Sequence, residues 1–108
     1  MKRFAAHYVF IPPNQTFQLH CVELDEKNGF SKVFPLEKEI ANTSFFNGIL
    51  LFSKEELSVD FLQRLSFLNS AIFQQLESQN LPKIEEKEVV FVYHLDDRIV
   101  KKLLISCN

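Results

Sequence analysis

The fold is decided by the stretch TFQLHCVELDEKNGFSKVFPLEKEI, residues 16–40, and by FFNGILLF, residues 45–52. In the first stretch, two segments of strand-like polarity flank DEKNG, a pattern typical of two strands joined by a tight turn. Asn28-Gly29 suits the positive φ that such a turn requires. The second stretch, together with Ser44 before it, predicts a buried strand over residues 44–52, in which Gly48 allows another backbone to approach closely.

Other segments of the sequence also predict strands. Residues 3–11 are β-branched and aromatic enough for a strand, and Pro12-Pro13-Asn14 ends it. Both faces of residues 16–24 are mixed, which predicts a twist or bulge near Cys21. Residues 85–95, EEKEVVFVYHL, predict a last clear strand. Residues 97–106 fit either a closing strand or a short amphipathic helix.

The apolar period changes after Ser53. Ser53 is followed three residues later by Glu56, which is a capping-box pattern for a helix start. Apolar residues then recur every three or four positions, which predicts one long amphipathic helix over about residues 54–79. We expect it to pack on the chain's own sheet, with a coiled coil as the alternative. The residues of its apolar face are Leu57, Phe61, Leu65, Leu68, Ile72 and Leu76.

The predicted fold class is α+β in one domain, residues 1–108. It combines a small, mostly antiparallel β-sheet or sandwich with the one long helix packed against it. N-terminal hairpin strands are completed by a C-terminal strand. The divisions are a β-rich part at 1–52, a helix at 53–80, and a closing strand and tail at 88–106.

Composition excludes several classes of protein. Apolar residues make up 46% and charged residues 24%, as in ordinary globular domains. The net charge is −2 without a basic stripe, so we predict no nucleic-acid partner. No apolar run approaches the ~20 residues of a membrane span, and the start lacks a signal-peptide pattern. Cys21 and Cys107 are expected to be reduced thiols, which predicts a cytoplasmic protein.

Catalytic patterns are missing from the sequence. His7, His20 and His94 lie far apart, and neither Cys-x-x-Cys nor His-x-x-x-His occurs. His20 and Cys21 are neighbours in a strand, so their side chains should point to opposite faces. His94-Leu95-Asp96-Asp97 predicts a strand end and a turn. We therefore predict no catalytic, cofactor-binding or metal-binding residue, and no enzyme.

The quoted stretches, together with RFAAHYVF at residues 3–10, resemble the small β-domain that precedes the catalytic barrel in amidohydrolases of the cytosine-deaminase and chlorohydrolase type. Val22-Glu23-Leu24-Asp25 through Gly29 matches the strand pair of that domain. Asn47 to Leu51 matches the approach to its metal-binding histidines. After Phe52, however, SKEELSVDF contains neither Pro-Gly nor His-x-His, and the chain has no room for the barrel.

The C-terminal stretch VVFVYHLDDRIVKKLLI, residues 89–105, is similar to the segment that returns from the barrel to complete that domain. The resemblance implies a composite β-domain alone, with one long helix where the barrel would be inserted.

These observations predict a non-catalytic interaction or self-associating module, working as a homodimer or with another protein partner. Either an uncovered sheet edge or surplus apolar positions on the helix, such as Leu62 or Phe73, would hold the partner. One alternative is a small-ligand site between helix and sheet near His20, Tyr93 and His94. Another is an accessory partner of a full-length amidohydrolase.

Overall fold

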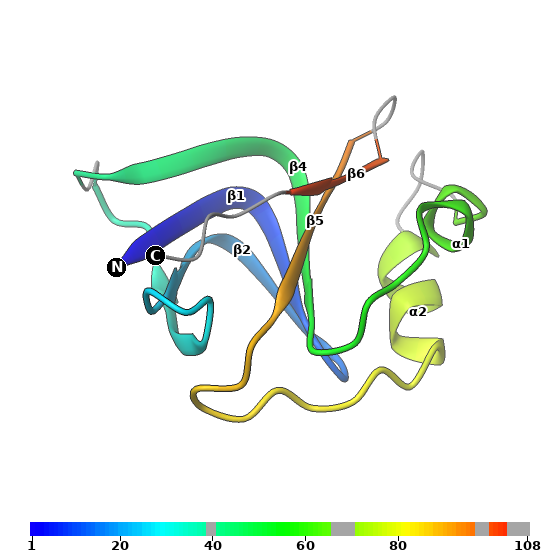
Figure 1. The fold of residues 1–108 in the computed structure, drawn as a ribbon. Helices are drawn as coiled ribbons and strands as arrows, with labels where there is room; N and C mark the ends of the chain where they lie inside the picture. Colours follow the sequence, from blue (N-terminus) through cyan, green and yellow to red (C-terminus); the bar gives the residue numbers. More distant parts are fainter. Residues whose placement is uncertain (39–40, 66–70, 97–99, 104–108) are drawn as a thin grey trace.

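The computed structural model describes residues 1–38, 41–65, 71–96 and 100–103 of the 108-residue chain. Its strands form one curved sheet in the order β3-β2-β1-β4-β5-β6 (Figure 1). β1 and β4 run parallel, and all the other neighbouring strands are antiparallel. The strands are β1 (Lys2–Ile11), β2 (Gln15–Leu24), β3 (Phe30–Pro35), β4 (Thr43–Ser53), β5 (Phe91–Leu95) and β6 (Val100–Leu103).

A carboxylate holds the turn between β2 and β3. Asp25 Oδ1 accepts hydrogen bonds from the backbone N–H groups of Lys27 and Gly29, both at 2.8 Å. Asn28 has a φ of 64°, the left-handed conformation that asparagine tolerates well. The turn predicted at Asn28-Gly29 is confirmed, and its positive φ lies at Asn28.

The alternation of β2 is interrupted before Cys21. Leu19 has a φ of 53°, which is rare for a leucine in a strand. The first residues of the strand are exposed or half-buried, whereas Cys21–Leu24 are all buried. The mixed faces seen in the sequence therefore mark a real irregularity, two residues before the predicted position.

A second irregularity separates two halves of the β1–β4 pair. The register passes from Ala6 opposite Phe46 to Tyr8 opposite Ile49, so β4 holds one residue more than β1. Gly48 lies in this bulge with a φ of 91°, and a Cβ there would lie 2.5 Å from the Leu95 carbonyl oxygen. The close backbone approach predicted at Gly48 is confirmed. Bulges bend strands, and β1 and β4 curve strongly in Figure 1.

The curl brings the start of β3 against the segment that leads into β5. The Phe30 N–H donates to the Glu88 carbonyl at 2.9 Å, and the Lys87 N–H donates to the Phe30 carbonyl at 2.7 Å. The Val90 N–H completes this seam by donating to the Asn28 carbonyl at 3.1 Å. These hydrogen bonds tie the edge strand β3 and the turn before it to the segment before β5.

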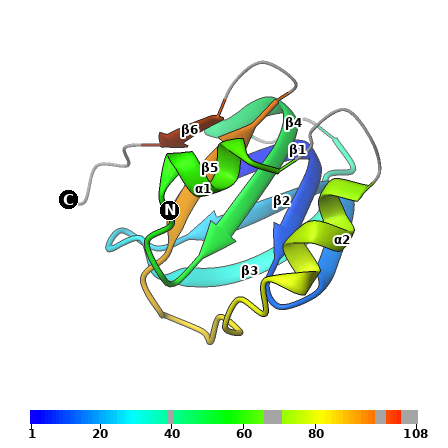
Figure 2. The same ribbon diagram turned by 90° about the vertical axis from the view of Figure 1, so that its right-hand side faces the viewer.

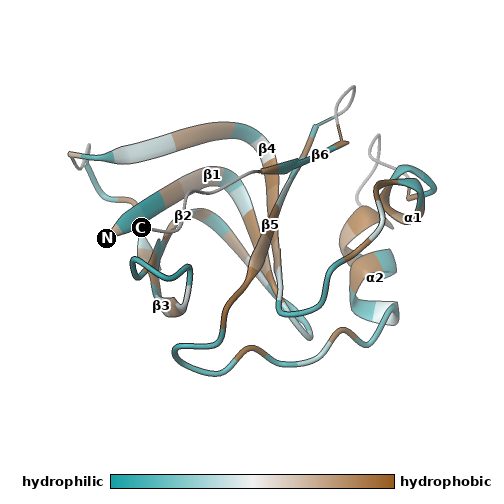
Figure 3. Ribbon diagram, in the orientation of Figure 1, coloured by the Kyte–Doolittle hydropathy of each residue, from teal (hydrophilic) through white to brown (hydrophobic). Residues whose placement is uncertain are grey.

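The sheet has an inner face, inside the curl, and an outer face that α1 (Val59–Gln63) and α2 (Ala71–Ser78) cover in part (Figure 2). Apolar residues fill both faces, and Figure 3 shows hydrophobic colour along the sheet and on parts of both helices. The inner cluster comprises Ala6, Val9, Ile11, Val22, Leu24, Leu50, Phe52, Ile84, Val90 and Val92. The outer cluster comprises Phe10, Ile49, Leu51, Leu62, Ile72, Leu76, Leu81, Tyr93 and Leu95.

The prediction of one long helix over 54–79 is wrong. Residues 54–58 are not helical, and α1 ends at Gln63, where the Arg64 and Leu65 N–H groups turn to carbonyls three residues back. Ser58, not Ser53, caps α1, since its hydroxyl accepts the Phe61 N–H at 3.0 Å. The helical spacing of apolar residues continues across both short helices because both bury their apolar residues on the same outer face of the sheet. The spacing alone therefore predicted one long helix.

The predicted fold class is therefore wrong, because it rested on one long helix packed against the sheet. The chain is mostly β: its curved six-stranded sheet is antiparallel except at the β1–β4 pair, and the described residues form two short helices in place of the single long helix. The parallel β1–β4 pair was not predicted, because its crossover is made by the β2–β3 hairpin and a connection rather than by a helix. Of the undecided segment 97–106, Val100–Leu103 is the strand β6, and 97–99 and 104–106 lie outside the described residues.

Candidate functional site

Large apolar side chains lie uncovered on the central strands of the sheet, around the two irregularities. Tyr8 of β1 is 37% exposed, Leu19 of β2 is 45% exposed and Phe45 of β4 is 47% exposed. His7 connects them, because its ring stands edge-on to Phe45 at 5.2 Å and the β1–β2 register places it opposite Leu19. We call Tyr8, Leu19, Phe45 and His7 the bulge patch.

One helix borders the bulge patch. The Phe73 ring of α2 packs 5.3 Å from the Tyr8 ring, and Phe73 itself is half-buried. Of the two helix positions predicted to be surplus, Phe73 thus lies at this border, whereas Leu62 is fully buried in the outer cluster. The sequence analysis did not predict the patch, because strict alternation would place Tyr8 on one face with Ala6 and Phe10, which are buried.

The residues of the predicted small-ligand alternative are not brought together. Tyr93 faces α1 and α2, where its hydroxyl accepts the Leu57 N–H at 2.6 Å. Its neighbour His94 instead has its ring 5.1 Å from Phe46, with Nε2 2.5 Å from the Asn47 carbonyl oxygen. His20 packs at 4.8 Å against Phe17, on β2.

Cys21, the neighbour of His20 in β2, is a buried free thiol. Cys21 is fully buried, and burial raises the pKa of its thiol, so the thiolate is disfavoured. Glu23, on the same strand, is also buried, and Arg3 of β1 donates to its carboxylate at 3.0 Å. Cys107 and Asp97 lie outside the described residues.

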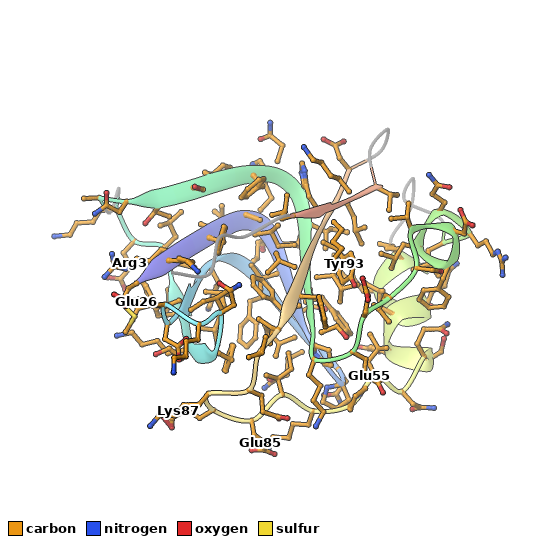
Figure 4. The ribbon with its side chains drawn as sticks, in the orientation of Figure 1. Arg3, Glu26, Glu55, Glu85, Lys87 and Tyr93 are labelled. Carbon is orange, nitrogen blue, oxygen red and sulfur yellow. The ribbon has the colours of Figure 1, made fainter. Side chains whose placement is uncertain are left out.

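A pocket of about 560 Å³ opens at the end of the curl where β1 and β4 begin and β6 ends. Two cationic pairs line it: Lys2 and Arg3 from β1, and Lys101 and Lys102 from β6. Figure 4 shows Arg3 at this end of the sheet, far from Tyr93. The dipeptides Lys-Arg and Lys-Lys were visible in the sequence, but only the sheet order brings the two strands to one opening. We call this the mouth pocket.

Within the described residues, no three His, Cys, Asp or Glu side chains converge as metal ligands. None of the described helices is long and apolar enough to cross a membrane. No family model, no curated protein and no solved structure matches the chain. The resemblance to the amidohydrolase β-domain, and with it an amidohydrolase partner, therefore stays a prediction.

Proposed function

We propose that this chain is a non-catalytic interaction module that self-associates through the bulge patch. The observation that carries the proposal is the exposure of Tyr8, Leu19 and Phe45 on central strands. Central strands normally bury their apolar side chains, and exposed apolar patches mark interaction sites. Aromatic residues are also enriched at protein interfaces, where they supply much of the binding energy.

Pairing of two copies is the simplest use of such a surface. A two-fold interface lets the same patch on each copy cover the other, so no second partner is needed. The His7 and Tyr8 rings provide polar tips at the rim of the patch, which suits a surface that is wet in the monomer and covered in the dimer. The interspersed charges and the two cysteines support the cytoplasm as the compartment.

Light scattering and sedimentation over a range of micromolar concentrations test this proposal. We expect the wild-type chain to approach twice the monomer mass and Phe45→Asp to remain monomeric, because a buried unpaired carboxylate is costly. Val89→Asp is the matched control, since Val89 is 55% exposed outside the patch and its variant should still dimerise. A monomeric wild type, or equal effects of both variants, would contradict the proposal.

A further inference from the structure

The floor of the mouth pocket is apolar and continuous with the inner core. Phe4 of β1 and Phe46 of β4 have ring centroids 6.3 Å apart, and both pack against the inner cluster. Leu103 of β6 packs against the same cluster. All three side chains are only partly buried. An apolar group entering the pocket would therefore extend the core.

The charged residues in the described lining of the pocket are cationic. Among the described residues, the lining includes four cationic residues and no acidic one: it comprises Met1, Lys2, Arg3, Phe4, Asn42, Ser44, Phe46, Lys101, Lys102 and Leu103. Cations around a cleft with low-dielectric walls focus the field and attract anions. The polar groups Asn42 and Ser44 are exposed beside them.

Three of the four cationic residues form hydrogen bonds or ion pairs within the fold. Arg3 donates to the Glu23 carboxylate at 3.0 Å, and Lys2 donates to the Asn28 side chain at 2.5 Å. Lys102 pairs with Glu56, and the hydrogen bond to that carboxylate raises the pKa of the ammonium group. Arg3 and Lys102 thus pair with carboxylates of the fold, and all three cations are engaged within the chain.

Lys101 is placed to act as that partner. It is exposed, and the β5–β6 register pairs it with His94, whose ring lies against Phe46 of the pocket floor. Because neighbouring residues of a strand alternate in direction, Lys101 and Leu103 share the inner face while Lys102 points toward α1 and Glu56. The ammonium group of Lys101 thus belongs to the side of β6 that faces the floor.

We propose that the mouth pocket binds a small amphipathic anion, an apolar body that bears a carboxylate. Phe4, Phe46 and Leu103 hold the apolar body, and Lys101 pairs with the carboxylate at the rim. The volume of about 560 Å³ lies within the range of ligand sites, roughly 300–1,000 Å³. This ligand site lies on the inner side of the curl and is separate from the bulge patch.

Titration of the labelled chain with decanoate, followed by amide NMR, tests the proposal. We expect saturable shifts at Phe4, Phe46 and Leu103. Lys101→Glu should weaken decanoate binding about tenfold or more, because it reverses the charge that meets the carboxylate. Lys83→Glu is the matched control, since Lys83 is exposed outside the pocket and its variant should bind decanoate like the wild type.

Two comparison ligands separate the parts of the site. Decanol, which has the same body without charge, should bind more weakly than decanoate, and acetate, which has the charge without the body, should not saturate. Equal binding of decanoate and decanol, saturation by acetate, or no shifts with decanoate would each overturn the proposal. Phe45→Asp should leave decanoate binding unchanged, so this result does not depend on self-association.

Discussion

At the scale of single residues, Tyr93 shows how one buried polar atom fixes a length of chain. Tyr93 is fully buried, and its hydroxyl accepts the Leu57 N–H at 2.6 Å, which ties β5 to the extended segment before α1 (Figure 4). Burial raises the pKa of Tyr93, so the neutral hydroxyl is the form present in the fold near neutral pH.

Tyr93→Phe should lower the free energy of unfolding by about 1–2 kcal/mol, because the Leu57 N–H loses its acceptor in a site that water reaches poorly. Urea denaturation measures this loss. Tyr8→Phe is the matched control: Tyr8 is 37% exposed and packs on Phe73 through its ring, so its variant should stay within about 0.5 kcal/mol. Equal losses in the two variants would show that the Tyr93 hydroxyl contributes nothing specific.

At the scale of elements, the sequence analysis placed the helix start at the wrong serine. The Ser53 hydroxyl is buried at the end of β4 and exchanges hydrogen bonds with the Glu55 backbone, at 2.7 and 3.1 Å. Ser58 is the residue that caps α1. The capping-box pattern favoured Ser53, because Glu56 follows it three residues later, whereas Phe61 occupies that position after Ser58.

Ser58→Ala should speed hydrogen exchange at the Phe61 amide and cost about 1 kcal/mol of stability, because that amide loses its capping acceptor. Ser58→Asp should restore slow exchange, since aspartate caps equally well. Ser53→Ala should leave the Phe61 amide unchanged. If the Phe61 amide exchanged fast in Ser53→Ala and slowly in Ser58→Ala, Ser53 rather than Ser58 would be the cap of α1.

Strands were far more predictable than helices in this chain. The predicted strands at 3–11, 16–24 and 44–52 lie within one residue of β1, β2 and β4, because buried alternation and flanking turn residues act locally. Helix length depends instead on what the apolar face meets. Two short helices and one long helix can place the same apolar residues on the sheet. The spacing of apolar residues therefore could not distinguish the two arrangements.

At the scale of the whole molecule, the arrangement of the strands was the part that the sequence could not provide. The parallel β1–β4 pair and the seam between residues 28–30 and 87–90 join segments far apart in the chain. The bulge patch and the mouth pocket both depend on this arrangement. Their residues, such as Phe45 and Lys101, look like ordinary strand residues until the sheet order is known.

The seam depends on the Asp25 turn, which presents Asn28 and Phe30 to the segment before β5. A Cβ on Gly29 would lie 2.6 Å from Asp25 Oδ2 and 2.9 Å from the Lys87 carbonyl oxygen, so turn and seam meet at this glycine. The N–H groups of Gly29 and Lys27 lower the pKa of Asp25 below its ordinary value of 3.8. Protonation of the half-buried Asp25 carboxyl is therefore expected to weaken the turn and the seam that it supports.

A lowered pKa fixes the sign of the pH dependence. The contribution of Asp25 to stability is complete above the unfolded-state pKa, near 3.9, and is lost as pH falls through the lower folded-state pKa. Asp25→Asn keeps an oxygen acceptor but cannot be protonated, so its thermal midpoint should fall less steeply than that of the wild type between about pH 4 and pH 2. Glu26→Gln, which removes the neighbouring carboxylate but no acceptor of the turn, should keep the wild-type slope. If Asp25→Asn lost stability in acid as steeply as the wild type, the turn would not be the acid-sensitive point of the closed sheet.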